Sequence, residues 1–157
     1  MMKRVLAVFI CAALFGISAI ADMGVNEDSF KSWLKSTSSF DGYKLDDDSF
    51  ENYDDREFSA TYEKSCCAIT VKVESMRSFP KPDELKESTM GSGKEVNVDG
   101  RKAAYYVYKT MELVSLNILV PELEAMVSIS SARKKMSLED MEKIAKKLNI
   151  GKFAKTN

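Results

Sequence analysis

A regular alternation of apolar and polar residues, from about Arg56 to Ser130, constrains the fold of this chain more than any other feature. Successive side chains of a β-strand point to opposite faces of a sheet, so the alternation predicts strands with one buried face. The alternation changes phase across residues 63–65, which predicts a hairpin turn there. Asp99-Gly100 predicts a second hairpin, because both residues of such a tight turn must accept a positive φ. We therefore expect consecutive antiparallel strands, with a flexible connection at residues 90–93, Met90-Gly91-Ser92-Gly93.

A short helix is predicted before this region. Phe30, Trp33 and Leu34 have the i, i+3, i+4 spacing of one apolar helix face, and Asn26 or Asp28 can cap the helix at its start. A helix with one apolar face is stable when that face is buried, so we expect it to pack on one side of the sheet.

The last predicted element is a helix that begins after Ser137 and ends near Gly151. Its apolar residues share one face, and they are Leu138, Met141, Ile144, Ala145 and Leu148. Because strands and helices do not alternate along the chain, a parallel doubly wound sheet is disfavoured. The predicted fold class is α+β, a curved antiparallel sheet of about six to eight strands packed against an N-terminal and a C-terminal helix.

The start of the chain has the three-part layout of a secretory signal peptide. Lys3 and Arg4 precede an uncharged stretch, which ends in Ala19-Ile20-Ala21, the small-x-small pattern that signal peptidase recognises. Cleavage after Ala21 divides the chain into a signal peptide, residues 1–21, and a single α+β domain, residues 22–157. The alternative is an uncleaved membrane anchor, because the 16 uncharged residues approach the roughly 17 that span a bilayer.

Composition narrows the classes of function. The 157 residues include no His, which excludes Ser-His-Asp and Cys-His catalysis as well as His-ligated zinc. Loss of the signal peptide changes the formal net charge from −1 to −3, so nucleic acid is not an expected partner. We expect no cofactor and no metal. We expect a protein that is periplasmic or secreted by a bacterium, with no stable membrane insertion after cleavage.

Cys66 and Cys67 are adjacent, and they are the sole cysteines after residue 21. In a regular strand their side chains would point to opposite faces, too far apart for a bond. A vicinal disulfide therefore requires the backbone to leave β geometry, which the turn predicted at residues 63–65 permits. Four states are open: a vicinal disulfide, two free thiols, a disulfide-linked dimer, or a soft-metal site. The alternative is that neither thiol has a chemical role: Cys67 is a small buried core residue, and Cys66 is a neighbour that the fold tolerates.

Tyr105, Tyr106 and Tyr108 occupy one predicted strand and alternate between its two faces. Residues 103–107 are apolar on both faces, which predicts a strand inside the sheet. One face is expected in the core. The other can line a ligand groove, because Tyr is favoured where one end of the side chain stays in water.

The pattern between residues 56 and 150 resembles that of small exported bacterial domains. The residues that carry it include Val98-Asp99-Gly100-Arg101, Ala104-Tyr105-Tyr106, Val127-x-Ile129-Ser130 and the capped helix after Ser137. Their layout is similar to the Mog1/PsbP-like and DUF4367-like groups. The resemblance implies a fold, and it implies a non-catalytic accessory or sensor module rather than a reaction.

A regular fold pattern without a catalytic constellation predicts an exported, non-enzymatic binding or accessory protein. Its partner would be another protein or a small ligand. The alternative is a periplasmic protein that uses Cys66 and Cys67 for thiol redox chemistry or for soft-metal binding.

Overall fold

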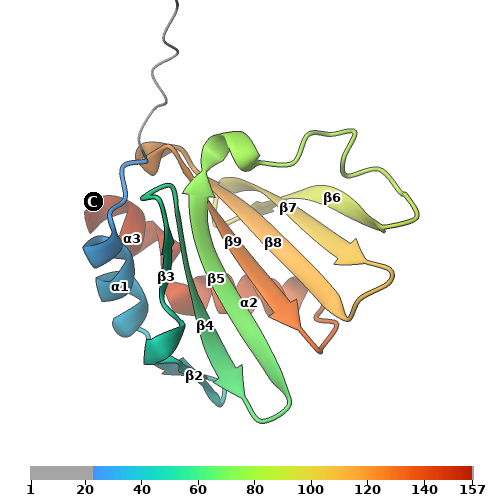
Figure 1. Cartoon of the computed structure of the whole chain (residues 1–157). Coiled ribbons are helices and arrows are strands. Elements are labelled where there is room, and N and C mark those ends of the chain that lie inside the picture. The colour runs from blue at the N-terminus through green and yellow to red at the C-terminus, as the bar shows by residue number, and fades with distance from the viewer. Residues whose placement is uncertain (1–22, 157) are drawn as a thin grey trace, which may run out of the picture.

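The computed structural model describes residues 23–156, in which the alternating region forms most of the strands of one antiparallel sheet (Figure 1). The predicted signal peptide, residues 1–21, lies outside the described residues. The strands are β1 (Ser39–Phe40), β2 (Tyr43–Leu45), β3 (Glu51–Tyr53), β4 (Glu57–Lys64), β5 (Cys67–Ser75), β6 (Gly91–Val98), β7 (Arg101–Tyr108), β8 (Leu113–Val120) and β9 (Ala125–Ala132). The helices are α1 (Glu27–Lys35), α2 (Leu138–Leu148) and α3 (Ile150–Thr156), and single 3-10 turns are η1 (Asp47–Ser49), η2 (Met76–Ser78) and η3 (Pro121–Leu123).

The nine strands follow the order β1-β2-β4-β5-β9-β8-β7-β6, and β3 pairs with β4 off this path. All the pairs are antiparallel. The last strand, β9, enters the middle of the sheet, where Ile129 is paired with Val71 of β5 and with Leu116 of β8. The α+β fold class is confirmed, with one strand more than the upper number expected.

Both predicted hairpins are present. β4 and β5 join through Ser65 and Cys66, and β6 and β7 join through Asp99 and Gly100. Asp99 has a φ of 49° and Gly100 a φ of 81°, the positive values that such a tight turn requires. Residues 103–107 lie in β7, which is inside the sheet because β6 covers its outer edge.

Two local predictions are wrong. Residues 90–93, expected as a flexible connection, are mostly strand, because β6 begins at Gly91 and pairs with β7. The left-handed residue that ends α2 is Asn149, with a φ of 53°, whereas Gly151 lies inside α3. Asn tolerates this conformation because its short polar side chain can bond locally. Here Oδ1 of Asn149 accepts a hydrogen bond from the backbone N–H of Lys152 at 3.2 Å.

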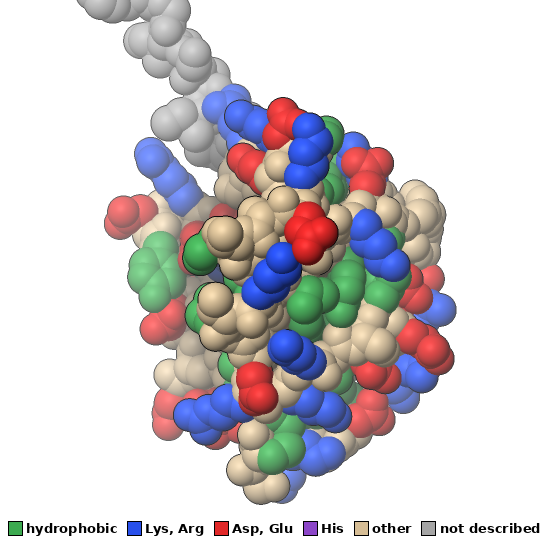
Figure 2. Space-filling view, turned by 90° about the vertical axis from the view of Figure 1, so that its right-hand side faces the viewer, with side chains coloured by type: hydrophobic (Ala, Val, Ile, Leu, Met, Phe, Trp, Pro, Cys, Tyr) green, Lys and Arg blue, Asp and Glu red, His purple; other side chains and the backbone are tan. Residues whose placement is uncertain are grey.

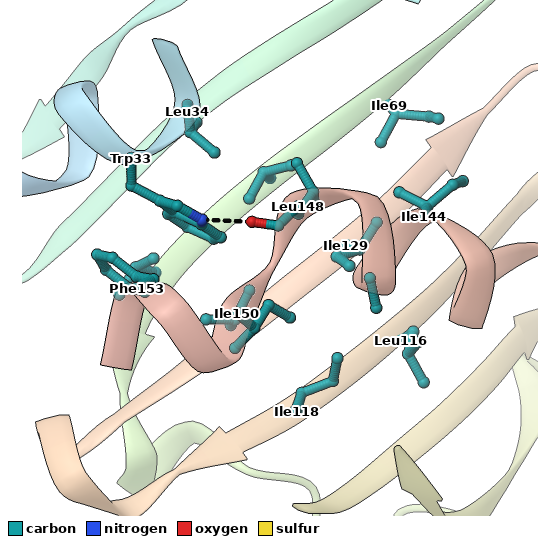
Figure 3. Close-up of a cluster of buried hydrophobic side chains, with 14 of the residues drawn as sticks. Trp33, Leu34, Ile69, Leu116, Ile118, Ile129, Ile144, Leu148, Ile150 and Phe153 are labelled. Carbon is teal, nitrogen blue, oxygen red and sulfur yellow. Dashed lines mark hydrogen bonds between the residues drawn. The ribbon is translucent and has the colours of Figure 1, made fainter. Parts of the chain in front are cut away.

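The three helices cover one face of the sheet; in Figure 1, α2 lies behind the strands, and α1 and α3 lie to their left. Apolar side chains of the sheet and of the helices meet in one core, among them Ile69, Leu116, Ile118 and Ile129 from the strands and Leu34, Ile144, Leu148, Ile150 and Phe153 from the helical segments (Figure 3). Trp33 connects the first helix to the last two. Its indole N–H donates to the carbonyl oxygen of Leu148 at 2.6 Å, and its ring stacks on Phe153 with centroids 4.1 Å apart.

A glycine allows close packing of the hairpin β6–β7. A Cβ at Gly91 would collide with the backbone oxygen of Val107 and with the ring of Tyr106. We expect Gly91→Ala to lower the free energy of unfolding by about 1–3 kcal/mol, because backbone atoms cannot move aside as a side chain can. Urea denaturation measures the loss.

The matched control is Gly151→Ala, since a Cβ there has no neighbour within 4 Å. Ala is favoured over Gly inside a helix by up to about 1 kcal/mol, so this control is expected to be neutral or stabilising. Equal losses in the two variants would contradict the packing argument.

Candidate functional site

The turn between β4 and β5 brings the sulfurs of the adjacent cysteines together. Cys66 lies in the turn and Cys67 is the first residue of β5. The two Sγ atoms are 2.7 Å apart, although side chains of neighbouring residues in a regular strand point to opposite faces. Both thiols are free; Cys66 is exposed, whereas Cys67 is buried, with a relative exposure of 5%. The pair thus consists of one accessible and one shielded thiol.

Tyr43 is a second polar neighbour of the shielded thiol. Its Oη lies 3.2 Å from the Sγ of Cys67, in a buried position. The hairpin β1–β2 places it there, turning at Asp41 and Gly42 with φ values of 48° and 84°. Pairing of β2 with the end of β4 then holds the hairpin beside the cysteines. No local sequence pattern identifies Tyr43, because only this long-range pairing brings it to Cys67.

Hydrogen bonds separate the pKa values of the two thiols. The pKa of Cys67 is lowered, first because the Cys66 S–H donates to its sulfur and second because the Tyr43 O–H does. The pKa of Cys66 is raised, chiefly because its proton is held in that bond to Cys67. Burial, followed by the hydrogen bond to Cys67, raises the pKa of Tyr43, so the phenol keeps its proton as a donor. Both directions favour ionisation of Cys67 before Cys66.

Two lysines add positive charge around this sulfur. Both Lys134 and Lys64 favour the thiolate of Cys67 and lower its pKa. The ammonium group of Lys64 donates to the backbone oxygen of Asp41 at 3.0 Å and lies 5.4 Å from the ring centroid of Tyr43. A positively charged setting of this kind is typical of reactive rather than structural cysteines.

The three tyrosines of the predicted groove do not share one face. Tyr105 points to the helix-covered side, where its hydroxyl donates to the backbone oxygen of Met136 at 2.7 Å. Tyr106 and Tyr108 lie on the opposite side, with ring centroids 4.8 Å apart in an edge-to-face contact. Tyr105 therefore fixes the segment before α2 to β7, while Tyr106 and Tyr108 form a separate aromatic pair.

Within residues 23–156, no group of three or more Cys, Asp or Glu side chains is arranged to hold a metal ion. In the same part of the chain, no helix has both the length and the apolar character needed to cross a bilayer. Comparison of the chain with protein-family models, with curated proteins and with solved structures finds no match. The resemblance to Mog1/PsbP-like and DUF4367-like domains stays a prediction from the sequence pattern.

Proposed function

We propose that this chain is an exported, non-enzymatic accessory protein that acts through reversible oxidation of the Cys66–Cys67 dithiol. The observation that carries the proposal is the 2.7 Å separation of the two sulfurs in a turn that exposes one of them. The expected export supports it, because disulfides form and persist in oxidising compartments.

The reaction is thiol–disulfide exchange with a disulfide oxidant, R–S–S–R. The pair first releases one proton to solvent, which leaves Cys67 as the thiolate. Cys66 then passes its own proton to the Cys67 sulfur along their hydrogen bond and attacks one sulfur of the oxidant. A mixed disulfide forms at Cys66, and the first R–S⁻ leaves and takes a proton from solvent. Cys67 loses its proton to solvent and attacks the Cys66 sulfur, which closes the vicinal disulfide and releases the second R–S⁻, protonated in turn. The protein gives up two electrons and two protons, and the oxidant becomes two thiols.

The same geometry favours redox chemistry over soft-metal binding. Metal–thiolate bonds of about 2.3 Å, as in zinc sites, would meet at an angle of roughly 70° if the sulfurs stayed where they are. Such an angle is far from tetrahedral, so chelation of an ion by both sulfurs would require the turn to open. A bond between the sulfurs requires only that they approach to about 2.05 Å.

The test is a redox titration of the domain in buffers of increasing thiol-to-disulfide ratio, followed by acid quenching, alkylation and mass spectrometry. We expect two populations, one with both cysteines alkylated and one with neither, that interconvert reversibly. The Cys66→Ser/Cys67→Ser variant is the control and is expected to carry no label under any condition. A pair that stays fully alkylatable in the most oxidising buffer, or that oxidises only to a dimer, would refute the proposal.

An exposed apolar cluster supports partner binding as a second candidate. Tyr106 and Tyr108 lie near the end of β7, and exposed Met90 and Met111 lie beside that end, with relative exposures of 58% and 47%. The backbone N–H of Lys109 donates to the oxygen of Met90 at 2.9 Å, which holds the two segments together. Partner binding through this cluster does not depend on the thiols. A partner that still binds the Cys66→Ser/Cys67→Ser variant but no longer binds the Tyr108→Ser variant would favour this candidate.

A further inference from the structure

We infer that the redox partner of the dithiol is a small anionic thiol or disulfide, one that carries carboxylates as glutathione does. The inference rests on the proposed function and names its substrate class. An open hollow of about 670 Å³ lies beside Cys67, between the ends of β2, β4, β5 and β9. Ligand sites for small molecules commonly have volumes of about 300–1,000 Å³.

The hollow carries more positive than negative charge. Lys44, Lys64 and Arg133 line it, together with Asp46 and Glu63. Lys134, one residue further along the chain, adds its charge at Cys67. Figure 2 shows Lys and Arg side chains, with acidic ones among them, at the lower end of the molecule, where Figure 1 places the turn between β4 and β5.

Asp46 and Glu63 also line the hollow, and neither forms an ion pair with these basic side chains. Among residues 23–156, Lys44, Lys64 and Arg133 take part in none of the ion pairs. Arg133 follows β9 in a left-handed conformation with a φ of 64°, and the bond from Ser131 Oγ to the oxygen of Lys134 at 2.6 Å closes this loop. The loop thereby keeps Arg133 at the rim of the hollow and Lys134 close enough to act on Cys67.

Anionic groups of a bound disulfide can pair with these side chains while its sulfurs lie next to the cysteines. The same charges stabilise the R–S⁻ that leaves in each exchange step, because a thiolate is negative until it takes a proton. A concave site beside the dithiol suits a small molecule better than the surface of a folded protein. The expected preference is therefore for anionic over neutral and cationic disulfides.

The experiment measures the rate at which three disulfides oxidise the domain: glutathione disulfide, bis(2-hydroxyethyl) disulfide and cystamine, which are anionic, neutral and cationic. Each rate is divided by the rate of the same disulfide with free 3-mercapto-1-propanol, a neutral thiol, which removes differences in intrinsic reactivity. We expect the anionic disulfide to be favoured over the neutral one by about tenfold at low salt. The cationic disulfide should be the slowest, and the differences should shrink at high salt.

Lys44→Gln/Arg133→Gln is expected to remove most of the anionic preference. It should slow the neutral disulfide less, because that disulfide loses only the stabilisation of its leaving thiolate. A circular dichroism spectrum and a urea midpoint equal to those of the wild type show that the variant is folded. Lys86→Gln/Lys94→Gln is the control with the same change in net charge, at exposed positions outside the hollow, and should keep the preference.

Equal normalised rates for the three disulfides would overturn the inference and leave the proposed function standing. A preference lost equally in both double variants would also overturn it, since the effect would then come from net charge. If none of the three disulfides oxidises the pair, both the inference and the proposed function fail.

Discussion

Replacing Trp33 by alanine is expected to lower the free energy of unfolding by about 3–5 kcal/mol, the range seen when a large aromatic side chain is removed from a core. The indole has a relative exposure of 7% and stacks on Phe153. Its N–H donates to the backbone oxygen of Leu148, at the end of α2, at 2.6 Å (Figure 3). The substitution would leave a cavity between α1 and α3 and an oxygen without its donor. Urea denaturation followed by circular dichroism measures the change.

Trp33→Phe is the matched variant, because it keeps an aromatic ring against Phe153 but lacks the indole N–H. We expect a smaller loss, with about 1 kcal/mol from the hydrogen bond and a further part from the smaller ring. A loss below 1 kcal/mol for Trp33→Ala would show that the first helix is not held to the core in the way described. A loss as large for Trp33→Phe as for Trp33→Ala would assign the effect to the hydrogen bond alone.

Cys67→Ser is expected to have the largest effect on the proposed thiol chemistry. The exposed Cys66 can still form a mixed disulfide, but the thiol that lies 2.7 Å away and would resolve it is gone. Reactions between groups held in contact outpace the same reactions between separate molecules by large factors. We therefore expect the mixed disulfide to persist at least about 100-fold longer than in the wild type, as followed by mass spectrometry after exposure to glutathione disulfide.

Cys66→Ser is expected to show the opposite behaviour, with little mixed disulfide formed at all. Cys67 is buried and bonded to Tyr43, so its reaction with the same disulfide should be slow and should accumulate little mixed disulfide. Faster trapping at Cys67 than at Cys66 would reverse the assigned order of attack. Equal, rapid turnover in both single variants would mean that the two thiols do not act as a pair.

Local sequence signals account for much of the fold. Asn26 caps α1 and Ser137 caps α2, each through a reciprocal pair of side-chain bonds at the helix start. Asp99-Gly100 turns β6 into β7. Such features depend on residues a few positions apart, which is why a single sequence is enough to predict them. The failure at residues 90–93 has the opposite cause, because Gly91 is extended only where a neighbouring strand and Tyr106 pack against it.

The candidate site also combines features that the sequence predicts with features that it does not predict. That Cys66 and Cys67 are adjacent and near a turn is evident in the sequence, and the turn explains how their sulfurs meet. Tyr43 and Lys44, however, come from β2, and Arg133 comes from the loop after β9. No local pattern relates those segments to the cysteines, so the environment that sets the thiol pKa values was not predictable.

The sequence by itself determined the antiparallel strands, their hairpins, the apolar faces of the helices and the adjacency of the two thiols, because each depends on neighbours along the chain. Only the tertiary structure decided that β9 lies between β5 and β8 and that β2 lies beside β4. Pairing across that distance depends on how the whole apolar face is buried, with the helices over it, and many registers satisfy the same alternation. The same long-range pairing placed a phenol and several positive charges around Cys67.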